Sequence, residues 1–428
     1  MKICIIGLGN MGISLMAYYS SIGHKVIGVD INKKIVGKIN KGNFKAHSNL
    51  ELYLRLQKSY KLGLIEATTN LGYAIKKCKV IIVIVPLVVN KKNKVDYSSI
   101  ISVSEKISDS LRRERLVIYE TTLPIGDTKK IILPILEKNG LKCGKDFWLV
   151  YSPERASPQN IFFSLNNYPK IVGGVNKEST KKGAKFYKKV LKAEVIVIED
   201  SETAEAVKLF GMVYRDVNIA LANEFAKFCQ KKNLNVSKII RLTNTNPYSH
   251  ILSPGIGVGG HCTPIYPYFL INGAEKLKIK LKLVKTARRI NENMPLYVIN
   301  LLKKTLKKIK GKKILILGLG YKEKSRQYFL SPSLRLIKKL KSKGAIVYLN
   351  DSCFVKKEIR KIGAIPVNMN SIKRLDIVIL VTYNKKYEKI DWENLKKKGL
   401  KLVIDGRNIL KREKIIKYGI NYKGIGIN

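Results

Sequence analysis

The chain has 428 residues, which suggests two or three domains, because single hydrophobic cores rarely extend beyond about 250–300 residues. Its hydrophobic fraction of 45%, without any apolar run of about 18–20 residues, predicts a cytoplasmic globular protein and excludes a membrane-spanning one. The formal net charge of +51 suggests nucleic-acid binding, but the lysines are spread along the chain, which favours a solvated surface without a nucleic-acid partner.

The first part of the chain alternates short apolar segments with helical ones. Strands are predicted at KICIIG, HKVIGVD, KVIIVIVP, RLVIYETT and DFWLVYSP, and helical patterns lie between them. This alternation is typical of a parallel sheet with crossover helices. We therefore predict a Rossmann-like α/β domain over residues 1–200.

A long helix is predicted to follow this domain. From Ser201 to Asn233 apolar residues recur every three or four positions without a glycine–proline break, which predicts one long, largely buried helix. Helical patterns continue to about Leu306. Residues 201–306 are therefore predicted to form a helical central domain.

A second α/β series begins after the basic segment KKIKGKK. Strands are predicted at ILILGLGYK, GAIVYLND, DIVILVTYN and KLVIDGRN, which gives a C-terminal domain over residues 307–428. The predicted fold class is thus α/β, with two Rossmann-like parallel-sheet domains joined by a helical middle that contains one long central helix.

A glycine-rich turn, GLGNMG, links the first predicted strand to the first helix. In such a turn Gly7 allows the tight bend, Gly9 lets a pyrophosphate approach the backbone, and Gly12 permits close packing of helix on strand. Asp30 ends the next strand, where a carboxylate would accept hydrogen bonds from ribose hydroxyls and repel a 2′-phosphate. These residues predict an NAD site, although the lysines that follow Asp30 leave room for some use of NADP.

A second glycine turn, ILGLGYK at residues 316–322, lacks the third glycine. No acidic residue ends its next strand at the usual distance. A second dinucleotide is therefore not predicted there, and a less specifically bound nucleotide or a decayed repeat of the fold fits the pattern better.

The six cysteines are widely scattered and include no Cys-x-x-Cys pair, which fits neither a disulfide framework nor a zinc site. We therefore predict reduced thiols and no metal. Cys262 lies in a loop rich in glycine and proline, GVGGHCTP. A buried, inert thiol is the more common role of a cysteine, so this loop alone leaves chemistry and packing both open.

Further motifs occur in a fixed order along nearly the whole chain. They are ETTLPIGDT (120–128), YSPERASP (151–158), YPKIVGG (168–174), AEAVKL (204–209), YRDVNIALANE (214–224), GVGGHCTP (257–264), GLGYK (318–322) and DGRN (405–408). Together, and in this register, they resemble the motifs of the UDP-glucose/GDP-mannose dehydrogenase family, the nucleotide-sugar 6-dehydrogenases.

Members of that family oxidise the primary 6-hydroxyl of a sugar to a carboxylate, with two hydride transfers to two NAD⁺. By this resemblance Cys262 is the nucleophile that forms a thiohemiacetal and then a thioester. Lys208 would stabilise the developing alkoxide and relay a proton. Thr122 and Glu154 would hold the hydrolytic water and assist its deprotonation.

The resemblance also implies NAD as cofactor, a UDP-sugar as substrate, and a homodimer or higher homo-oligomer built around the long helix. Cations at the substrate positions would pair with diphosphate or sugar oxygens. The cofactor-binding positions are Gly7, Gly9, Asn10, Met11, Gly12, Asp30, Lys34 and Thr122, and the substrate-binding positions are Glu154, Arg155, Lys208, Arg215, Gly259, Tyr321, Lys322 and Arg407.

Some positions depart from the family pattern. Tyr266 stands where the family has an aspartate, and a tyrosine cannot act as a carboxylate base at neutral pH. Met212 stands where the family has an asparagine, and a methionine cannot usefully hydrogen-bond an oxyanion. Lys208 would therefore carry more of the stabilisation of the oxyanion, or Asn218 would help. The four predicted catalytic residues are unchanged, which favours a divergent but active enzyme. The departures are Tyr266 for aspartate, Met212 for asparagine, Leu87-Val88 for threonine-proline and Phe329 for arginine.

The substrate is predicted from the pattern Glu-Arg-x-x-Pro between Glu154 and Pro158, which resembles the branch that acts on UDP-N-acetylhexosamines. We predict oxidation of UDP-N-acetyl-D-mannosamine or UDP-N-acetylglucosamine to the uronate, with UDP-glucose as the alternative. A β-hydroxyacid-type dehydrogenase is more distant, because it needs neither the cysteine loop nor a second α/β domain. A non-enzymatic binding protein is a further alternative.

Overall fold

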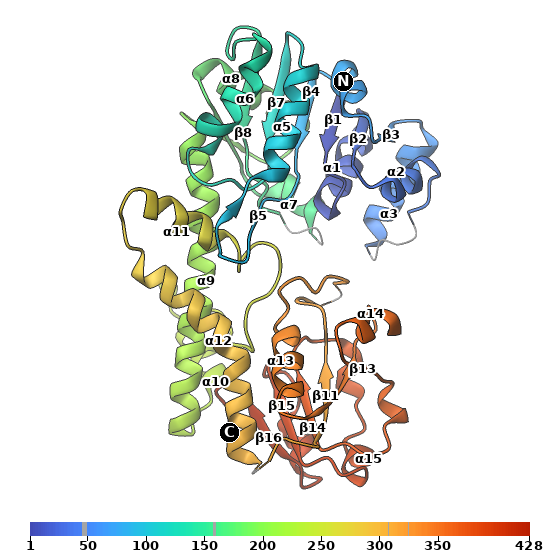
Figure 1. Ribbon diagram of the computed structural model, residues 1–428, viewed down its shortest axis with the longest axis vertical. Coiled ribbons are helices and arrows are strands. Elements are labelled where there is room, and N and C mark those ends of the chain that lie inside the picture. The colour runs from blue at the N-terminus through green and yellow to red at the C-terminus, as the bar shows by residue number, and fades with distance from the viewer. Residues whose placement is uncertain (45–48, 157–159, 307, 324) are drawn as a thin grey trace. The chain divides into compact units, whose positions relative to one another are not determined.

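The computed structural model describes residues 1–44, 49–156, 160–306, 308–323 and 325–428 (Figure 1). Pro158, used above in the argument on the substrate, lies outside the described residues. The chain divides into two compact units, one made of Met1–Gly211 and Tyr268–Lys278 and the other of Met212–Pro267 and Ile279–Asn428. The division into three domains at 200/201 and 306/307 stays a prediction.

The sheet of the first unit has the strand order β10-β9-β8-β7-β4-β1-β2-β3, and every neighbouring pair is parallel except β8 with β9. Within it, β3-β2-β1-β4-β7-β8 repeats the order 3-2-1-4-5-6 of dinucleotide-binding folds. Ligands of such folds bind beyond the carboxyl ends of the central strands. The strands are β1 (Lys2–Ile6), β2 (Lys25–Val29), β3 (Ile65–Thr68), β4 (Val80–Val83), β7 (Arg115–Tyr119), β8 (Phe147–Tyr151), β9 (Lys170–Gly174) and β10 (Val195–Ile198), with a separate hairpin of β5 (Val88–Val89) and β6 (Val95–Asp96).

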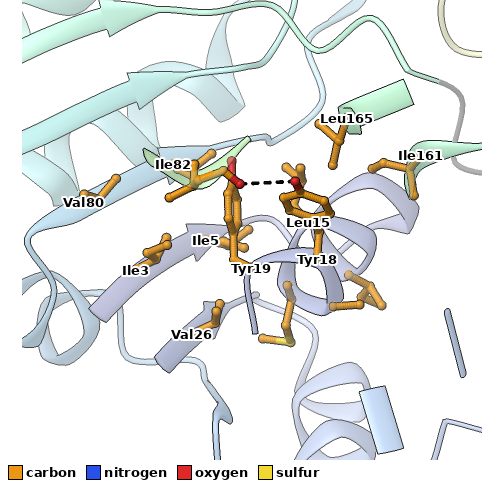
Figure 2. Packing of buried hydrophobic residues seen from close by; sticks show 14 of the residues in the cluster. Ile3, Ile5, Leu15, Tyr18, Tyr19, Val26, Val80, Ile82, Ile161 and Leu165 are labelled. Atoms are coloured by element: carbon orange, nitrogen blue, oxygen red, sulfur yellow. Dashed lines mark hydrogen bonds between the residues drawn. The ribbon is translucent and has the colours of Figure 1, made fainter. Parts of the chain in front are cut away.

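The core of the first unit forms because its central strands are apolar on both faces, as expected for parallel strands covered by helices. Ile5 of β1, Leu15 and Tyr19 of α1 and Ile161 of α7 belong to one cluster of buried residues (Figure 2). Asparagine side chains cap the N-termini of α2, α3, α4 and α8. The helices are α1 (Asn10–Ser21), α2 (Lys33–Asn40), α3 (Leu50–Lys61), α4 (Leu71–Lys77), α5 (Ser98–Ser110), α6 (Leu133–Leu136), α7 (Ile161–Asn167) and α8 (Lys177–Val190), with a π-helical turn η1 (Thr128–Ile132) and a 3-10 turn η2 (Glu137–Asn139).

The second unit contains an all-parallel sheet with the order β13-β12-β11-β14-β15-β16, again 3-2-1-4-5-6 in chain order. The predicted fold class, with two Rossmann-like sheets, is therefore confirmed. The strands are β11 (Lys313–Leu317), β12 (Ile346–Asn350), β13 (Ile365–Pro366), β14 (Ile377–Leu380), β15 (Leu402–Asp405) and β16 (Asn421–Gly424), and the helices are α10 (Val236–Thr243), α12 (Lys282–Thr305), α13 (Pro332–Lys341), α14 (Lys356–Lys361), α15 (Trp392–Lys397) and α16 (Arg412–Ile416), with 3-10 turns η3 (Met369–Ser371) and η4 (Lys385–Lys389). Helix α11 (Tyr266–Lys276) begins in this unit and ends in the first.

The predicted long helix is α9 (Ser201–Lys232), visible in Figure 1 as the longest green ribbon. The expectation that it is largely buried is wrong for the single chain, because one of its faces exposes large apolar side chains. Among the helices of the described residues, none combines the length and the apolar character that a bilayer crossing requires. The exposed large apolar residues on the part of α9 in the second unit are Tyr214, Leu221, Phe225 and Phe228, with exposed fractions of 56%, 44%, 41% and 60%.

Candidate active site

The three glycines of the turn after β1 meet different surroundings. Gly7 has φ +100°, and a Cβ there would lie 2.9 Å from the carbonyl oxygen of Ile84. A Cβ on Gly12 would lie 1.8 Å from the carbonyl oxygen of Gly7, so α1 packs directly on the turn. A Cβ on Gly9 would meet no described atom within 4 Å. Two glycines therefore allow backbone packing, whereas Gly9 leaves space for a ligand.

Asp30 follows β2 and holds this turn. Its Oδ2 accepts a hydrogen bond from the Leu8 N–H at 2.8 Å, and its Oδ1 accepts one from the Asn32 N–H at 2.8 Å. Helix α1 begins at Asn10 beside the open space at Gly9, so its first N–H groups and its dipole favour an anion there. Open space, a helix N-terminus and a nearby carboxylate together fit the pyrophosphate and ribose of NAD.

Two of the predicted catalytic residues, Lys208 and Glu154, meet in the first unit. The half-buried Lys208 on α9 donates from Nζ to the backbone carbonyl oxygen of Glu154 at 2.7 Å. The Glu154 N–H donates to the carbonyl oxygen of Glu120 at 3.3 Å. Thr122, also buried, lies two residues after Glu120 in the segment that leaves β7. This unit thus combines an amine, a carboxylate and a hydroxyl near one set of strand ends.

The carboxylate of Glu154 is buried and clamped at both oxygens. Its Oε1 accepts from the Ala156 N–H at 2.6 Å, and its Oε2 lies 3.1 Å from Nζ of Lys170. Burial opposes the charged form, but the Lys170 ammonium, the Ala156 N–H and the Lys208 ammonium outweigh it and hold the pKa of Glu154 below its ordinary value. Glu154 is therefore ionised at neutral pH.

Glu205 connects two segments of this group. It is fully buried on α9, one turn before Lys208. Its Oε1 accepts from the N–H and the hydroxyl of Thr128 at 2.9 and 2.5 Å, and its Oε2 accepts from the Gly126 N–H at 2.5 Å. Burial raises the pKa of Glu205 to about 7, although these hydrogen bonds oppose the rise. Glu205 thereby ties the segment that holds Thr122 to the helix that carries Lys208.

The cysteine loop belongs to the second unit, and its thiol is exposed. Gly260 has φ +103°, and its N–H donates to the carbonyl oxygen of Phe329 at 2.9 Å. The next residue, His261, stacks on the Phe329 ring with 4.3 Å between ring centroids. A Cβ on Gly259 would lie 2.8 Å from Cβ of Tyr321, which makes glycine necessary there. The loop is therefore held by close contacts, while Cys262 faces solvent, which favours chemistry over packing.

Two predicted substrate residues lie against this loop in the second unit. Tyr321 packs on Gly259 and donates from its hydroxyl to Oε1 of Gln327 at 2.9 Å. Arg407 follows β15, and its Nη1 would lie 3.4 Å from a Cβ on Gly255. The buried Asp405 orients the Arg407 segment by accepting its N–H at 2.9 Å. Tyr321 therefore borders the loop that carries the thiol, and Arg407 borders the segment just before it.

The remaining predicted positions have different surroundings. Arg155 donates to the carbonyl oxygen of Pro169 within the first unit. Asn10 is exposed at the start of α1, and Met11 packs partly buried against the core. The exposed side chains at the predicted binding positions also include Lys34, Arg215 and Lys322.

The residues that differ from the family pattern lie in different parts of the structure. Tyr266 begins α11, and its N–H donates to the carbonyl oxygen of Cys262 at 2.9 Å. Met212 is half-buried on α9, whereas Leu87 is buried beside the β5–β6 hairpin that contains Val88. Phe329, in place of the expected arginine, supplies the ring on which His261 stacks. At position 329 an aromatic ring that packs on the cysteine loop therefore stands in place of the expected positive charge.

Sequence reasoning missed several charged residues that the structure draws into these groups. Glu120 ends an apolar stretch, Lys170 begins one and Glu205 lies within one, and a charge next to apolar residues is the signal that would have found them. Asp351 was also missed, because it lies further along the chain from Gly318 than Asp30 lies from Gly7. Nevertheless Asp351 follows β12 directly and accepts from the N–H groups of Leu319 and Gly320 at 2.7 and 3.1 Å. An acidic residue therefore does close the second glycine turn.

Comparison with known proteins covers the whole chain. Family models match the NAD binding domain of the UDP-glucose/GDP-mannose dehydrogenase family over residues 1–191, its central domain over 202–293 and its UDP binding domain over 315–412. The chain is 33% identical over 432 residues to the UDP-N-acetyl-D-mannosamine dehydrogenase of Pyrococcus horikoshii, covering 100% of this chain and 99% of the relative.

Solved structures agree with this result. The UDP-D-ManNAc dehydrogenase structure from Pyrococcus horikoshii matches with a TM-score of 0.89 at 32% identity, covering 100% of this chain and 99% of that one. The UDP-N-acetyl-mannosamine dehydrogenase Cap5O from Staphylococcus aureus matches with a TM-score of 0.83 at 27% identity, covering 100% and 98%.

An NAD-binding turn on one Rossmann-like sheet and a UDP-binding domain on another define an oxidoreductase that uses NAD and acts on UDP-sugars. The chain belongs to the UDP-glucose/GDP-mannose dehydrogenase family. The resemblance inferred from the sequence motifs is therefore confirmed, as is NAD as the cofactor.

The steric difference between the glycines can be tested with two alanine variants. Gly12→Ala should lower the free energy of unfolding by about 1–3 kcal/mol, because its Cβ would overlap the Gly7 carbonyl oxygen. Gly9→Ala should change that free energy by less than about 0.5 kcal/mol but weaken NAD binding about tenfold or more. Denaturant unfolding and NAD titration measure the two effects. Unchanged NAD affinity in Gly9→Ala would contradict the assignment.

Glu205 should make stability depend on pH. Its pKa of about 7 in the folded chain lies above the ordinary value of 4.5, so the folded state binds this proton more tightly than the unfolded state. The contribution of this proton to the free energy of unfolding is fully present below a pH of about 4.5. It falls by about 2–4 kcal/mol as the pH rises to about 7 and then stays constant.

Glu205→Gln removes this titration, so its stability should fall less over the same pH range. The neighbouring Asp127, whose pKa burial raises to about 6, remains in both proteins and contributes to both curves. Urea unfolding of wild type and variant at pH 5, 6 and 7 measures the difference. Parallel curves would show that Glu205 does not titrate in this range.

Proposed function

We propose that this protein oxidises the 6-hydroxyl of a UDP-N-acetylhexosamine to a carboxylate, with UDP-N-acetyl-D-mannosamine or UDP-N-acetylglucosamine as substrate. The observation that carries the proposal is the exposed thiol of Cys262 on a glycine loop held by close contacts. An alcohol dehydrogenase that stops at the aldehyde needs no such nucleophile. The full-length relatives named for UDP-N-acetyl-D-mannosamine support this choice of sugar.

Cys262 is the proposed nucleophile. Its thiolate adds to the carbonyl carbon of the intermediate aldehyde and forms a thiohemiacetal. Loss of a hydride from that carbon gives a thioester, and water then attacks the thioester, releases the thiolate and leaves the carboxylate. NAD supplies the hydride acceptor when bound. The whole change consumes one sugar, two NAD⁺ and one water, and it yields the uronate, two NADH and three protons.

The groups of the first unit have proposed roles in proton transfer and charge stabilisation. Lys208 is proposed to supply the ammonium that stabilises the alkoxide of the alcohol and the oxyanion of the thiohemiacetal. The ionised Glu154 accepts a proton from the hydrolytic water, and the hydroxyl of Thr122 holds that water. Because Met212 cannot serve as a hydrogen-bond donor, Lys208 acts with less support at the oxyanion, and Asn218 is the proposed substitute.

The binding residues are proposed on chemical grounds. Cations and hydroxyls suit the diphosphate and sugar oxygens of the substrate, and the glycine turn with Asp30 suits NAD. A cytoplasmic location is proposed as well, because the mechanism needs a reduced thiol. The proposed substrate contacts are Arg155, Arg215, Gly259, Tyr321, Lys322 and Arg407, and the proposed cofactor contacts include Asn10, Met11, Lys34 and Thr122.

The yield of NADH per UDP-sugar tests the proposed function. With limiting UDP-N-acetyl-D-mannosamine, UDP-N-acetylglucosamine or UDP-glucose, the preferred sugar should give two NADH and one carboxylate, measured by absorbance and by mass spectrometry of the product. A yield of one NADH would show that the protein is a simple alcohol dehydrogenase. A clearly higher kcat/KM with UDP-glucose would overturn the choice of sugar.

The variant Cys262→Ser is the control for the covalent step. It should reduce carboxylate output by about 10³-fold or more, because a serine hydroxyl at neutral pH is a far weaker nucleophile than a thiolate. Cys353→Ser, at another cysteine that is not fully buried, should leave output near that of wild type. Normal carboxylate output from Cys262→Ser would show that the thioester mechanism is wrong.

We also propose a homodimer that packs the exposed face of α9 against a second copy. Leu221, Phe225 and Phe228 recur at spacings of four and three residues, so they share one face of the helix. Their exposure in the single chain leaves an apolar stripe that a second copy of the same helix would cover. The stripe supports the expectation of an oligomer built around this helix.

The dimer is tested by placing a charge on this stripe. Phe225→Glu should shift the chain from dimer to monomer, because a desolvated carboxylate is costly in an apolar interface. Ile416→Glu, at an exposed apolar residue on α16, is the matched control and should keep the wild-type mass. Analytical ultracentrifugation measures both. A wild-type monomer, or a Phe225→Glu dimer as stable as wild type, would contradict the proposal.

A further inference from the structure

A buried lysine links two carboxylates in the first unit. Lys170, the first residue of β9, is 5% exposed, and its Nζ lies 3.1 Å from Oε2 of Glu154 and 3.3 Å from Oε1 of Glu120. Tyr187 of α8 donates from its hydroxyl to the same Oε1 of Glu120 at 2.6 Å. The ammonium also lies over the Tyr187 ring, 5.1 Å from its centroid. One buried cation therefore serves two acids.

The carboxyl groups of Glu120 and Glu154 differ in how many of their oxygens have hydrogen-bond or ion-pair partners. Oε2 of Glu120 has no hydrogen-bond partner among the described residues, whereas both oxygens of Glu154 are engaged. Burial accordingly raises the pKa of Glu120 despite the nearby Lys170 ammonium, while the pKa of Glu154 is lowered. A neutral cluster results when Glu120 keeps its proton and Lys170 pairs with ionised Glu154.

A buried pair of this kind is by itself weak evidence for a role in stability. Desolvating two charges costs about as much as their attraction returns, and replacing a buried ion pair by apolar residues is often neutral or stabilising. The strand around Lys170 is otherwise apolar, with Ile171 and Val172 buried. A hydrophobic residue would suit that environment better than lysine, so the position calls for a role beyond packing.

We propose that Lys170 is a positioning residue that holds the Glu154 carboxylate in place and in its anionic form, and that it also orients Lys208. This inference rests on the proposed function, in which Glu154 and Lys208 take part in the reaction. The link to Lys208 runs through Glu154, because Nζ of Lys208 donates to the backbone carbonyl oxygen of the residue whose side chain Lys170 holds. Loss of the clamp on the Glu154 side chain frees the segment that receives this bond.

The test compares pH–rate profiles of Lys170→Met, Lys170→Arg and wild type, with the UDP-sugar that wild type oxidises. In Lys170→Met the acid limb of kcat should move up by about 1–3 pH units, because Glu154 loses its cation. Its kcat at neutral pH should fall at least about tenfold with little change in KM for the sugar. Lys170→Arg keeps a cation and should restore the position of the acid limb.

Two further variants make the result decisive. Lys182→Met, which removes the exposed α8 lysine lying 4.1 Å from the Trp148 ring centroid, is the matched control and should behave as wild type. If Lys170→Met fails to fold, the double variant Lys170→Met/Glu120→Gln removes one of the two buried acids that Lys170 contacts. That double variant should fold and show the same upward shift of the acid limb.

The outcomes separate this inference from the proposed function. If Lys170→Met or the double variant keeps the acid limb and the kcat of wild type, the proposed role of Lys170 is wrong. The proposed function still stands in that case if the wild-type protein yields two NADH per sugar. An equal loss of kcat in Lys170→Met and Lys170→Arg, without a shift in pH, would show a purely structural role. Failure of wild type to oxidise any UDP-sugar would overturn both.

Discussion

The carboxyl edge of the parallel sheet in the first unit is the constraint on which the candidate site depends. Parallel strands all end at one edge, so the segments that leave β1, β2, β7 and β8 emerge together whatever their separation in sequence. These segments carry the glycine turn, Asp30, Thr122 and Glu154. Hydrogen bonds between neighbouring strand ends fix their register, such as the one from the Glu154 N–H to the carbonyl oxygen of Glu120.

The single antiparallel pair of this sheet explains how a lysine enters the same region. Tyr151, the last residue of β8, pairs with Gly173 of β9, so the beginning of β9 extends beyond the carboxyl end of β8. The hydroxyl of Ser152 donates to the carbonyl oxygen of Ile171 at 2.7 Å and holds this overlap. A parallel β9 would have carried Lys170 to the opposite edge. The reversal therefore brings a cation to carboxylates that would otherwise be buried without one.

This topology also determines what could be predicted from the sequence. GLGNMG and Asp30 act through local geometry that repeats in dinucleotide-binding turns, so their spacing is sufficient to recognise them. The partnership of Lys170 with Glu120 depends on the direction of β9, which apolar periodicity does not reveal. Glu205 depends in the same way on the packing of α9 against Gly126 and Thr128, where η1 begins. The exposed stripe on α9 was missed because apolar periodicity does not distinguish a buried face from one that awaits a partner.

The two glycine turns show how one architecture supports different chemistry. Both follow the first strand of a 3-2-1-4-5-6 sheet, and both are closed by an aspartate after the second strand. The space beside Gly9 is open, whereas a Cβ on the corresponding Gly320 would lie 2.6 Å from the carbonyl oxygen of Ser325. The chain itself fills the place that a pyrophosphate would take, and α13 begins only at Pro332. The second turn therefore lacks both the space and the adjoining helix N-terminus of a dinucleotide site, which leaves its domain to recognise a smaller nucleotide by other groups.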